Sequence, residues 1–347
     1  MRLDGARIRL LQGNHMETHK RFVVLGGGSM GRRRIRCLLA HGVPASAIRL
    51  VDVRQDRRAE CLSRHGVESL PDLEQALKWK PHAVVVSTPT RFHMECCAAA
   101  ARAGVDFFCE IALSDNLDGT EELATLVEQH GLVAALGIQT PYHPVVQRAK
   151  RWLTEPAMGR PLIYHFEWGN YLPNWHPWED YTAFYDPTQF EGVFVEDLGQ
   201  LYSLLDDSLA ELSCRTHKLG DLKIDGCDCF QLLGRTRKGT VVTFQFDLLQ
   251  DLQQTVYRIV CQKGVIEIRL FPDCRAERHL NATGLSEVYL PPKGYQYEQC
   301  YVDEFGAFLQ AIENRTPWHH PLEAGIHVLK CLEAARLSNK EGRLVTV

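Results

Sequence analysis

A glycine-rich loop between a short apolar run and a helical stretch constrains the fold of this chain more than any other feature. Residues Arg21–Leu25, with the sequence RFVVL, predict a buried strand, and Gly26, Gly28 and Gly31 follow it with the spacing G-x-G-x-x-G. A helical stretch then runs to about His41. A strand, a loop of this spacing and a helix, in that order, are the context in which the motif binds the pyrophosphate of a dinucleotide.

Each glycine of this loop has a steric reason to be there. Gly26 permits the tight turn, Gly28 lets the backbone approach a pyrophosphate, and Gly31 lets the helix pack closely on the strand. Ser29 and Met30 lie at the helix N-terminus, where free N–H groups face bound phosphates. We therefore predict that all five residues contribute to the cofactor site.

The acidic residue expected by the same motif is Asp52. It stands at the end of the next predicted strand, 21 residues after Gly31. A carboxylate at this place accepts hydrogen bonds from the ribose hydroxyls and repels a 2′-phosphate, so the predicted cofactor is NAD. Because arginines can accommodate that phosphate, Arg54, Arg57 and Arg58 keep NADP open as the less favoured alternative.

Strands and helices alternate over the first 140 residues, which predicts a doubly wound parallel sheet, that is, a Rossmann fold. After about Gln139 the strands become longer and alternate between apolar and polar residues, which predicts a C-terminal α/β domain with a large, mostly antiparallel open sheet. The predicted organisation is an N-terminal extension (1–19), an NAD-binding Rossmann domain (20–140), a substrate and oligomerisation domain (141–320) and a closing helix with its tail (321–347).

Composition narrows the class of protein. Net charge is −4 with no basic block, which argues against a nucleic-acid partner. No apolar run approaches the roughly 18 residues that a membrane helix needs, so no membrane partner is expected. The 12 cysteines lie in apolar or helical stretches and are interpreted as reduced thiols of a cytoplasmic protein. Cys227, Cys229 and His217 lack standard zinc spacing, so no metal site is predicted.

The chain resembles the glucose–fructose oxidoreductase, inositol dehydrogenase and rhizopine-catabolism (Gfo/Idh/MocA) family. The matching segments are VVLGGGSMG at Val23–Gly31, VVVSTPTRFH at Val84–His93 and AARAGVDFFCE at Ala100–Glu110, with weaker matches to about residue 345. The resemblance implies a Rossmann domain, a C-terminal α/β domain whose open sheet often serves oligomer contacts, and NAD(P)-dependent oxidation or reduction of sugars, nucleotide sugars or cyclitols. It therefore also implies a homodimer or homotetramer with a sugar-like substrate.

The resemblance assigns further residues to the cofactor cleft. Ser87, Thr88, Pro89 and His93 are expected to line its nicotinamide side. Glu110 is expected near the nicotinamide ribose, and Gln139 at the next strand end. Arg32, Arg33 and Arg34 are interpreted as a solvated helix face near the phosphates.

Two family hallmarks are replaced. The family reads Glu-Lys-Pro where this chain reads Glu110-Ile111-Ala112, and the family's histidine falls on Gly199 or Leu201. Lysine and histidine assist the transfer of the hydroxyl proton, which typically contributes a factor of about 10²–10⁴ in rate. Three readings follow: an oxidoreductase with relocated acid/base residues, a catalytically silent cofactor-binding partner or regulatory subunit, or a reductase of an imine or conjugated substrate. The acid/base candidates are His176, Tyr181, Glu196 and Asp197.

An aromatic and acidic segment, Asn170–Tyr185, is the second candidate site. Trp175 and Trp178 are suited to stack on the C–H faces of a sugar, and Glu179 and Asp180 to bind its hydroxyls. The alternative is that the tryptophans fill a gap between domains and the acids are solvated. Tyr142 and His143 complete the predicted substrate-binding residues.

Overall fold

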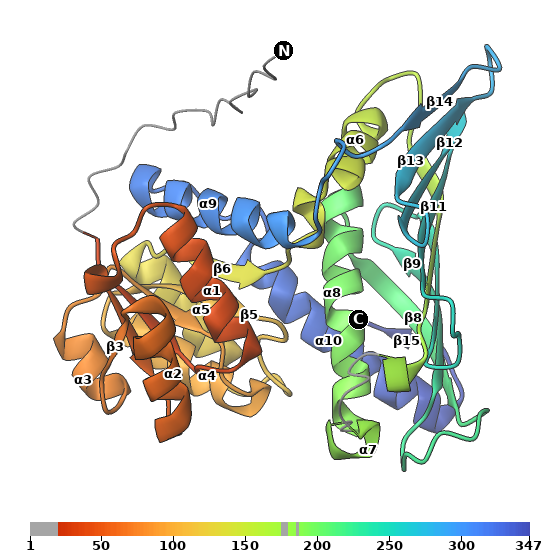
Figure 1. Cartoon of the computed structure of the whole chain (residues 1–347). Coiled ribbons are helices and arrows are strands. Elements are labelled where there is room, and N and C mark those ends of the chain that lie inside the picture. Colours follow the sequence, from red (N-terminus) through yellow and green to blue (C-terminus); the bar gives the residue numbers. More distant parts are fainter. Residues whose placement is uncertain (1–19, 175–179, 185–186) are drawn as a thin grey trace, which may run out of the picture.

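The computed structural model describes residues 20–174, 180–184 and 187–347. The predicted N-terminal extension, residues 1–19, lies outside the described part of the chain. Figure 1 shows a smaller α/β layer on the left, a tall sheet on the right, and helices α8 and α10 between them.

The N-terminal domain is built on a parallel sheet of strand order β3-β2-β1-β4-β5-β6. This is the doubly wound order predicted from the alternation of strands and helices, and it confirms the Rossmann half of the fold class. The strands are β1 (Phe22–Leu25), β2 (Ile48–Val51), β3 (Glu68–Ser69), β4 (Ala83–Val86), β5 (Asp106–Glu110) and β6 (Ala134–Gly137).

Alternate residues of these strands form two cores because successive side chains point to opposite faces of a sheet. Val24 and Phe108 pack in the cluster that contains α1 (Ser29–Ala40) and α9 (Glu298–Asn314). Val23 and Phe107 pack in the cluster that contains α4 and α5. The remaining helices of this domain are α2 (Gln55–His65), α3 (Leu73–Lys78), α4 (His93–Arg102) and α5 (Thr120–His130).

The second sheet is large and mostly antiparallel, as predicted. Its order is β14-β13-β12-β11-β7-β10-β9-β8-β15, and the central pair β7–β10 is parallel. The strands are β7 (Pro161–Gly169), β8 (Leu209–His217), β9 (Cys229–Thr236), β10 (Val241–Asp247), β11 (Gln254–Cys261), β12 (Gly264–Phe271), β13 (Arg275–Leu280), β14 (Ser286–Tyr289) and β15 (Val345–Thr346).

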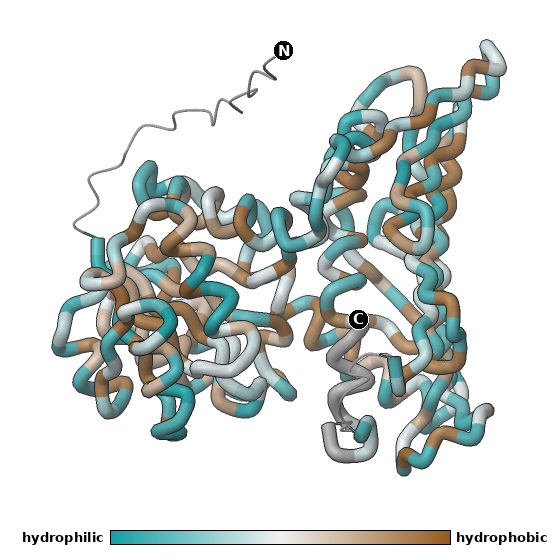
Figure 2. Tube along the Cα trace, in the orientation of Figure 1, coloured by the Kyte–Doolittle hydropathy of each residue, from teal (hydrophilic) through white to brown (hydrophobic). Residues whose placement is uncertain are grey.

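Helices α6 (Pro144–Leu153), α8 (Pro187–Leu205) and α10 (Leu322–Glu341) pack on one face of this sheet. Short helix α7 (Tyr181–Phe184) precedes α8. Residues along β9 alternate between buried and exposed, and those along β7 are buried or partly exposed; Figure 2 shows hydrophobic and hydrophilic residues interleaved over the tall sheet. The other face of the sheet is therefore left open, with Leu233 55% exposed and Ile163 43% exposed.

Candidate active site at the carboxyl edge of the parallel sheet

The glycine loop between β1 and α1 is closed by contacts that no larger residue permits. Gly26 has φ +93°, and a Cβ there would lie 2.4 Å from the carbonyl oxygen of Ser87. A Cβ on Gly31 would lie 1.7 Å from the carbonyl oxygen of Gly26. A Cβ on Gly28, in contrast, would meet a single group at 3.8 Å, the Arg57 guanidinium. The loop is packed tightly against its own domain and is open at Gly28, where the motif brings a phosphate to the backbone.

Asp52, which follows β2, binds the backbone of this loop. Its side chain is buried; Oδ2 accepts a hydrogen bond from the backbone N–H of Gly27 at 2.6 Å, and Oδ1 accepts one from Arg54 at 2.7 Å. The arginine side chains nearby bind protein acceptors: Arg54 pairs with Asp56, and Arg58 donates to the backbone oxygen of Asp52.

The turn after β4 supplies further polar groups beside the loop. The backbone N–H of Ser87 donates to Leu25, which ties β4 to β1, while the buried Oγ of Ser87 has no hydrogen-bond partner among the described residues. Pro89 is exposed. His93 is buried, and its two ring nitrogens lie 2.7 Å from the carbonyl oxygens of Thr88 and Ala112. The ring holds the β4 and β5 ends together rather than facing outward.

These residues fit a dinucleotide. Four features lie on the carboxyl edge of the parallel sheet. They are the open backbone at Gly28, the N-terminus of α1 with no acidic residue in its first turn, the Asp52 carboxylate and the Ser87 hydroxyl, which has no partner among the described residues. In doubly wound folds a dinucleotide lies across this edge. Ser29 and Met30 begin α1 at the same edge.

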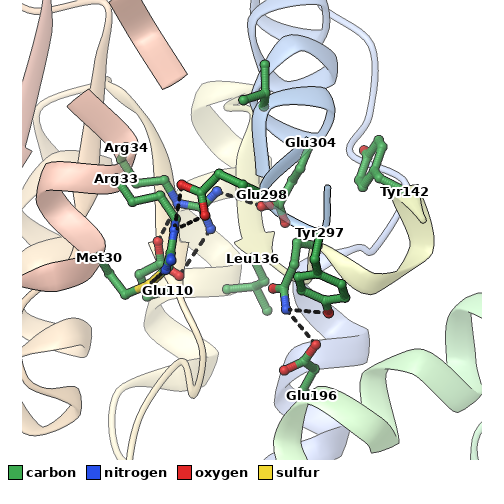
Figure 3. Close-up of polar contacts among 12 residues, drawn as sticks. Met30, Arg33, Arg34, Glu110, Leu136, Tyr142, Glu196, Tyr297, Glu298 and Glu304 are labelled. Carbon is green, nitrogen blue, oxygen red and sulfur yellow. Dashed lines mark hydrogen bonds and ion pairs between the residues drawn. The ribbon is translucent and has the colours of Figure 1, made fainter. Parts of the chain in front are cut away.

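A buried ion-pair cluster, which we call the arginine triad, joins α1, β5 and α9 (Figure 3). Arg34 has no solvent exposure; its Nε donates to Glu110 Oε1 at 2.5 Å and its Nη2 to Glu110 Oε2 at 3.2 Å. Its Nη1 donates to Glu304 Oε2 at 2.7 Å. Burial opposes the guanidinium charge, but Glu110 and Glu304 outweigh it and raise the pKa of Arg34.

The triad corrects the interpretation of the arginine run as a solvated helix face. Arg34 is fully buried, and Arg33 pairs with Glu298 on α9. Arg34 lies on the same helix stripe as Gly31, Ile35 and Leu38, all of them buried. That i, i+3, i+4, i+7 spacing was the available signal, and it marks the core face of the helix.

Within the described part of the chain, Glu304 is the carboxylate of the triad that has an unpartnered oxygen and a raised pKa. Its Oε1 is buried and has no hydrogen-bond partner among the described residues. Burial raises the pKa of Glu304 to about 7; Arg34 opposes this shift and Glu110 adds to it. One guanidinium therefore faces two carboxylates, of which the second holds a proton readily near neutral pH.

Glu304→Gln is expected to change how stability depends on pH. The folded-state pKa of Glu304 is raised to about 7 from its usual 4.5. The stability that this side chain contributes in its protonated form is therefore fully present below about pH 4.5 and is lost as the pH rises toward about 7. The variant, which cannot ionise there, should lose less stability over this range than wild type. Urea midpoints measured at intervals across the range test this, and parallel curves for the two proteins would contradict it.

A second polar cluster lies at the carboxyl end of β6. Gln139 Nε2 and Thr140 Oγ1 both donate to Glu196 Oε1, at 2.7 and 2.5 Å, and the Tyr297 hydroxyl lies 3.1 Å from Thr140 Oγ1 (Figure 3). Burial raises the pKa of Glu196, and the bonds from Thr140 and Gln139 oppose the shift. A carboxylate that holds its proton more firmly is suited to general acid and base chemistry.

Asp197 stands beside Glu196 on α8 and faces the second sheet. Its Oδ1 accepts a hydrogen bond from the Tyr257 hydroxyl at 3.1 Å, and burial together with Glu196 raises the pKa of Asp197 well above its usual range. The two adjacent carboxylates thus have different partners, Glu196 at the parallel sheet and Asp197 in the core of the antiparallel one.

The positions of the replaced family hallmarks are apolar. Ile111 packs against the main hydrophobic core, and the Ile111–Ala112 peptide bond is cis. Leu201 is buried in the same core. A Cβ on Gly199 would lie 2.3 Å from Ile138 Cδ1, so an imidazole at Gly199 would require repacking.

None of the remaining predicted residues that the structure describes is hydrogen-bonded to Glu196 in it, although the His143 ring lies 5.8 Å from the Tyr297 ring. The Tyr181 hydroxyl accepts from the backbone N–H of Lys223, and the exposed Asp180 bonds Thr182. Tyr142 bonds His319, and the buried His143 caps α6 through the N–H of Val145. Trp175, His176, Trp178 and Glu179 lie outside the described residues. Sequence reasoning missed Arg34, Thr140, Tyr297 and Glu304.

Within the described part of the chain, no group of three or more histidine, cysteine, aspartate or glutamate side chains is arranged to hold a metal ion. No helix there is both long and apolar enough to cross a membrane.

Comparison with known proteins gives a family match over the first domain. The model of the oxidoreductase family with an NAD-binding Rossmann fold (GFO_IDH_MocA) matches residues 20–138. Levoglucosan dehydrogenase of Pseudarthrobacter phenanthrenivorans is 28% identical over 161 residues, which cover 44% of this chain and 40% of that protein. The scyllo-inositol 2-dehydrogenase (NAD(+)) of Bacillus subtilis is 28% identical over 152 residues, 43% of this chain and 44% of that protein. The matches span less than half the length of these curated relatives.

Solved structures extend the likeness of fold to almost the whole chain. A levoglucosan dehydrogenase in complex with NADH superimposes with a TM-score of 0.83 at 17% identity, over 94% of this chain and 99% of that one. A myo-inositol 2-dehydrogenase from Lactobacillus plantarum gives a TM-score of 0.79 at 17% identity over the same shares. Both halves of the predicted fold class are therefore confirmed.

Proposed function

We propose that the chain, whose residues 20–138 match the model of the Gfo/Idh/MocA oxidoreductase family with its NAD-binding Rossmann fold, is an NAD-dependent oxidoreductase acting on a sugar, nucleotide sugar or cyclitol. Glu196 is the group that exchanges the hydroxyl proton. The observation that carries this proposal is the Glu196 carboxylate itself, hydrogen-bonded to Gln139 and Thr140 at the carboxyl end of β6.

In this proposal the cofactor transfers the hydride and Glu196 transfers the proton. NAD, when bound, accepts or supplies a hydride at carbon. In alcohol oxidation the hydroxyl proton goes to Glu196, and in carbonyl reduction Glu196 returns it. Gln139 and Thr140 both donate to one carboxylate oxygen, Oε1, and we assign the other, Oε2, to the substrate. Because burial raises the pKa of Glu196, its acid and base forms are closer in free energy than those of an exposed glutamate.

The substrate class is supported by what the relatives are named for. Levoglucosan and scyllo-inositol are both rings carrying several hydroxyls. The exposed Asp180, with Trp175, Trp178 and Glu179 of the same segment, supplies polar and aromatic groups suited to such rings. Tyr142 and His143 are the other proposed substrate contacts, while Tyr181 and His176 remain alternative candidates for the acid/base role.

The proposal is tested by mixing the full chain with NAD and a panel of cyclitols, anhydrosugars and nucleotide sugars while following NADH absorbance. Turnover with at least one polyol, abolished by omitting NAD, is the expected result. NADH binding measured by fluorescence without turnover on any polyol would contradict the proposal.

NADH binding without turnover would favour a catalytically silent cofactor-binding subunit. The observation behind this alternative is that Ile111 and Leu201 occupy apolar positions where the family resemblance implies lysine and histidine. Turnover that appears in Ile111→Lys but not in wild type would support it. Turnover of an imine or a conjugated carbonyl alone would instead support the third reading, a reductase that needs little proton transfer.

We propose in addition that the open face of the antiparallel sheet is a homodimer interface. Its outer residues combine exposed apolar side chains, Ile163, Leu233 and Val241, with the hydrogen-bonded pairs His165–Thr243 and Gln231–Gln245. A flat face with apolar side chains among satisfied polar pairs suits a self-complementary contact.

Leu233→Asp is expected to convert the dimer to monomer, because the twofold axis would bring two buried carboxylates into the interface. Light scattering coupled to size exclusion measures the mass. Leu62→Asp, on exposed helix α2, is the matched control and should leave the mass unchanged. A wild-type monomer, or a Leu233→Asp dimer, would contradict the proposed interface.

A further inference from the structure

The hydroxyl groups around Glu196 form a continuous hydrogen-bonded chain that leads away from the carboxylate. Thr140 Oγ1 lies 2.5 Å from Glu196 Oε1, and the Tyr297 hydroxyl lies 3.1 Å from Thr140 Oγ1. Gln139 Nε2 donates to Glu196 and also lies 3.4 Å from the Tyr297 oxygen. Three elements meet here: the turn after β6, helix α8 and the segment that begins α9.

The direction of each proton in this chain follows from counting donors. An ionised carboxylate only accepts, so the single proton of Thr140 points at Glu196. The Thr140 oxygen then accepts the proton of Tyr297, and the Tyr297 oxygen accepts from the Gln139 amide. Once Glu196 is protonated the same three groups can be bonded in the opposite direction, from Glu196 through Thr140 to Tyr297.

We propose that Tyr297 is the outer end of a proton relay, in which Thr140 passes the proton between Glu196 and Tyr297 and Tyr297 exchanges it with solvent. This inference rests on the proposed role of Glu196. In alcohol oxidation the substrate hydroxyl gives its proton to Glu196 Oε2, and rotation of the carboxyl group then turns that proton toward Thr140. The proton moves to the Thr140 oxygen as the Thr140 proton moves to the Tyr297 oxygen. The original Tyr297 proton leaves to water, and no electrons are transferred in the relay.

The geometry favours Tyr297 over the other tyrosine at the carboxylate pair. Tyr257, which bonds Asp197, is 1% exposed and lies within β11, whereas Tyr297 is a partly exposed residue at the start of α9. A relay to solvent needs an outer member that water can reach, and Tyr297 meets this requirement.

Other ionisable groups also face Glu196 and bear on its titration. Glu110 of β5 raises the pKa of Glu196, as burial does, while Thr140 and Gln139 lower it. The groups that in turn sense the Glu196 charge are Asp197 of α8, Tyr257 of β11, and Tyr297, Tyr301 and Glu304 of the α9 region.

The relay is tested first without substrate, by infrared difference titration of the full chain. The Glu196 carboxyl band is assigned by its loss in Glu196→Gln. Removing the Thr140 hydroxyl in Thr140→Val should raise the titration midpoint by about one to two pH units, since a hydrogen bond to a charged group is worth about 1.5–3 kcal/mol. Thr140→Ser should restore it, and Tyr297→Phe should shift it the same way by a smaller amount.

Tyr295→Phe is the matched control, because Tyr295 lies two residues away and its hydroxyl contacts Cys300, outside the chain of hydroxyls. With a turned-over substrate, Tyr297→Phe should lower kcat about tenfold and leave KM for NAD unchanged. A Glu196 midpoint that is unchanged in both Thr140→Val and Tyr297→Phe would overturn the relay even in an active enzyme. A shifted midpoint in a protein that turns over no substrate would show that the hydroxyl groups are coupled to Glu196, but it would overturn the proposed oxidoreductase and the relay's part in it.

Discussion

Arg34→Met is expected to lower the free energy of unfolding by about 3–5 kcal/mol, the usual cost of removing one partner from a buried ion pair. The guanidinium is fully buried and satisfies two carboxylates, Glu110 and Glu304, from elements far apart in the chain. Methionine fills much of the same volume, so the loss reports the two unpaired carboxylates rather than a cavity. Urea unfolding, compared by midpoint and slope, measures the change.

The neighbouring arginine supplies the control. Arg36 is half-exposed and pairs with Glu298 at 3.2 Å, so Arg36→Met should cost less than about 1 kcal/mol. Adding Glu304→Gln to Arg34→Met should recover part of the lost stability, since it removes one of the unpaired charges. Equal losses for Arg34→Met and Arg36→Met would show that the triad contributes no more than a surface pair.

The triad would also be expected to affect the cofactor site. Glu110 ends β5 at the carboxyl edge of the parallel sheet, where a dinucleotide lies in this fold. Arg34 holds both oxygens of that carboxylate. NADH affinity measured on Arg34→Met under conditions where the variant is folded should therefore fall together with stability.

The sequence predicted the first domain well because its glycine motif and its apolar strands are each contained in a short segment of the chain. The loop at Gly26, Gly28 and Gly31 and the apolar strand before it need no knowledge of distant residues. The predicted strand, Arg21–Leu25, agrees with β1 to within one residue. The change to alternating strands after Gln139 likewise predicted an antiparallel sheet, which the structure confirms.

What sequence reasoning missed depends on partners far along the chain. Arg34 looks solvated within its arginine run because the carboxylate that buries it, Glu304, comes 270 residues later. Thr140 and Tyr297 are ordinary residues until the fold brings them to Glu196, 56 and 101 residues away respectively. Helix α9 follows all but the last strand of the second sheet in the sequence yet packs against α1 of the Rossmann domain, and no local pattern carries that information.

The largest expected effect on activity belongs to Glu196→Gln, which should lower kcat by about 10²–10⁴ with any substrate the wild type turns over. Glutamine keeps the volume, and its amide oxygen can still accept from Thr140 and Gln139. It cannot take up a proton, so the change isolates proton transfer from packing. Steady-state rates at saturating NAD measure kcat, and fluorescence titration should show NADH affinity unchanged.

Asp197→Asn separates the two carboxylates. Asp197 bonds Tyr257 in the core of the second sheet, and asparagine keeps an acceptor for that hydroxyl. If Glu196 exchanges the proton, Asp197→Asn should lower kcat far less than Glu196→Gln does. The reverse ranking would move the proton-exchanging role to Asp197, whose pKa is also raised by burial and by Glu196. Because the two side chains leave α8 toward different sheets, one pair of rate measurements distinguishes an active site at the end of β6 from one built on Tyr257.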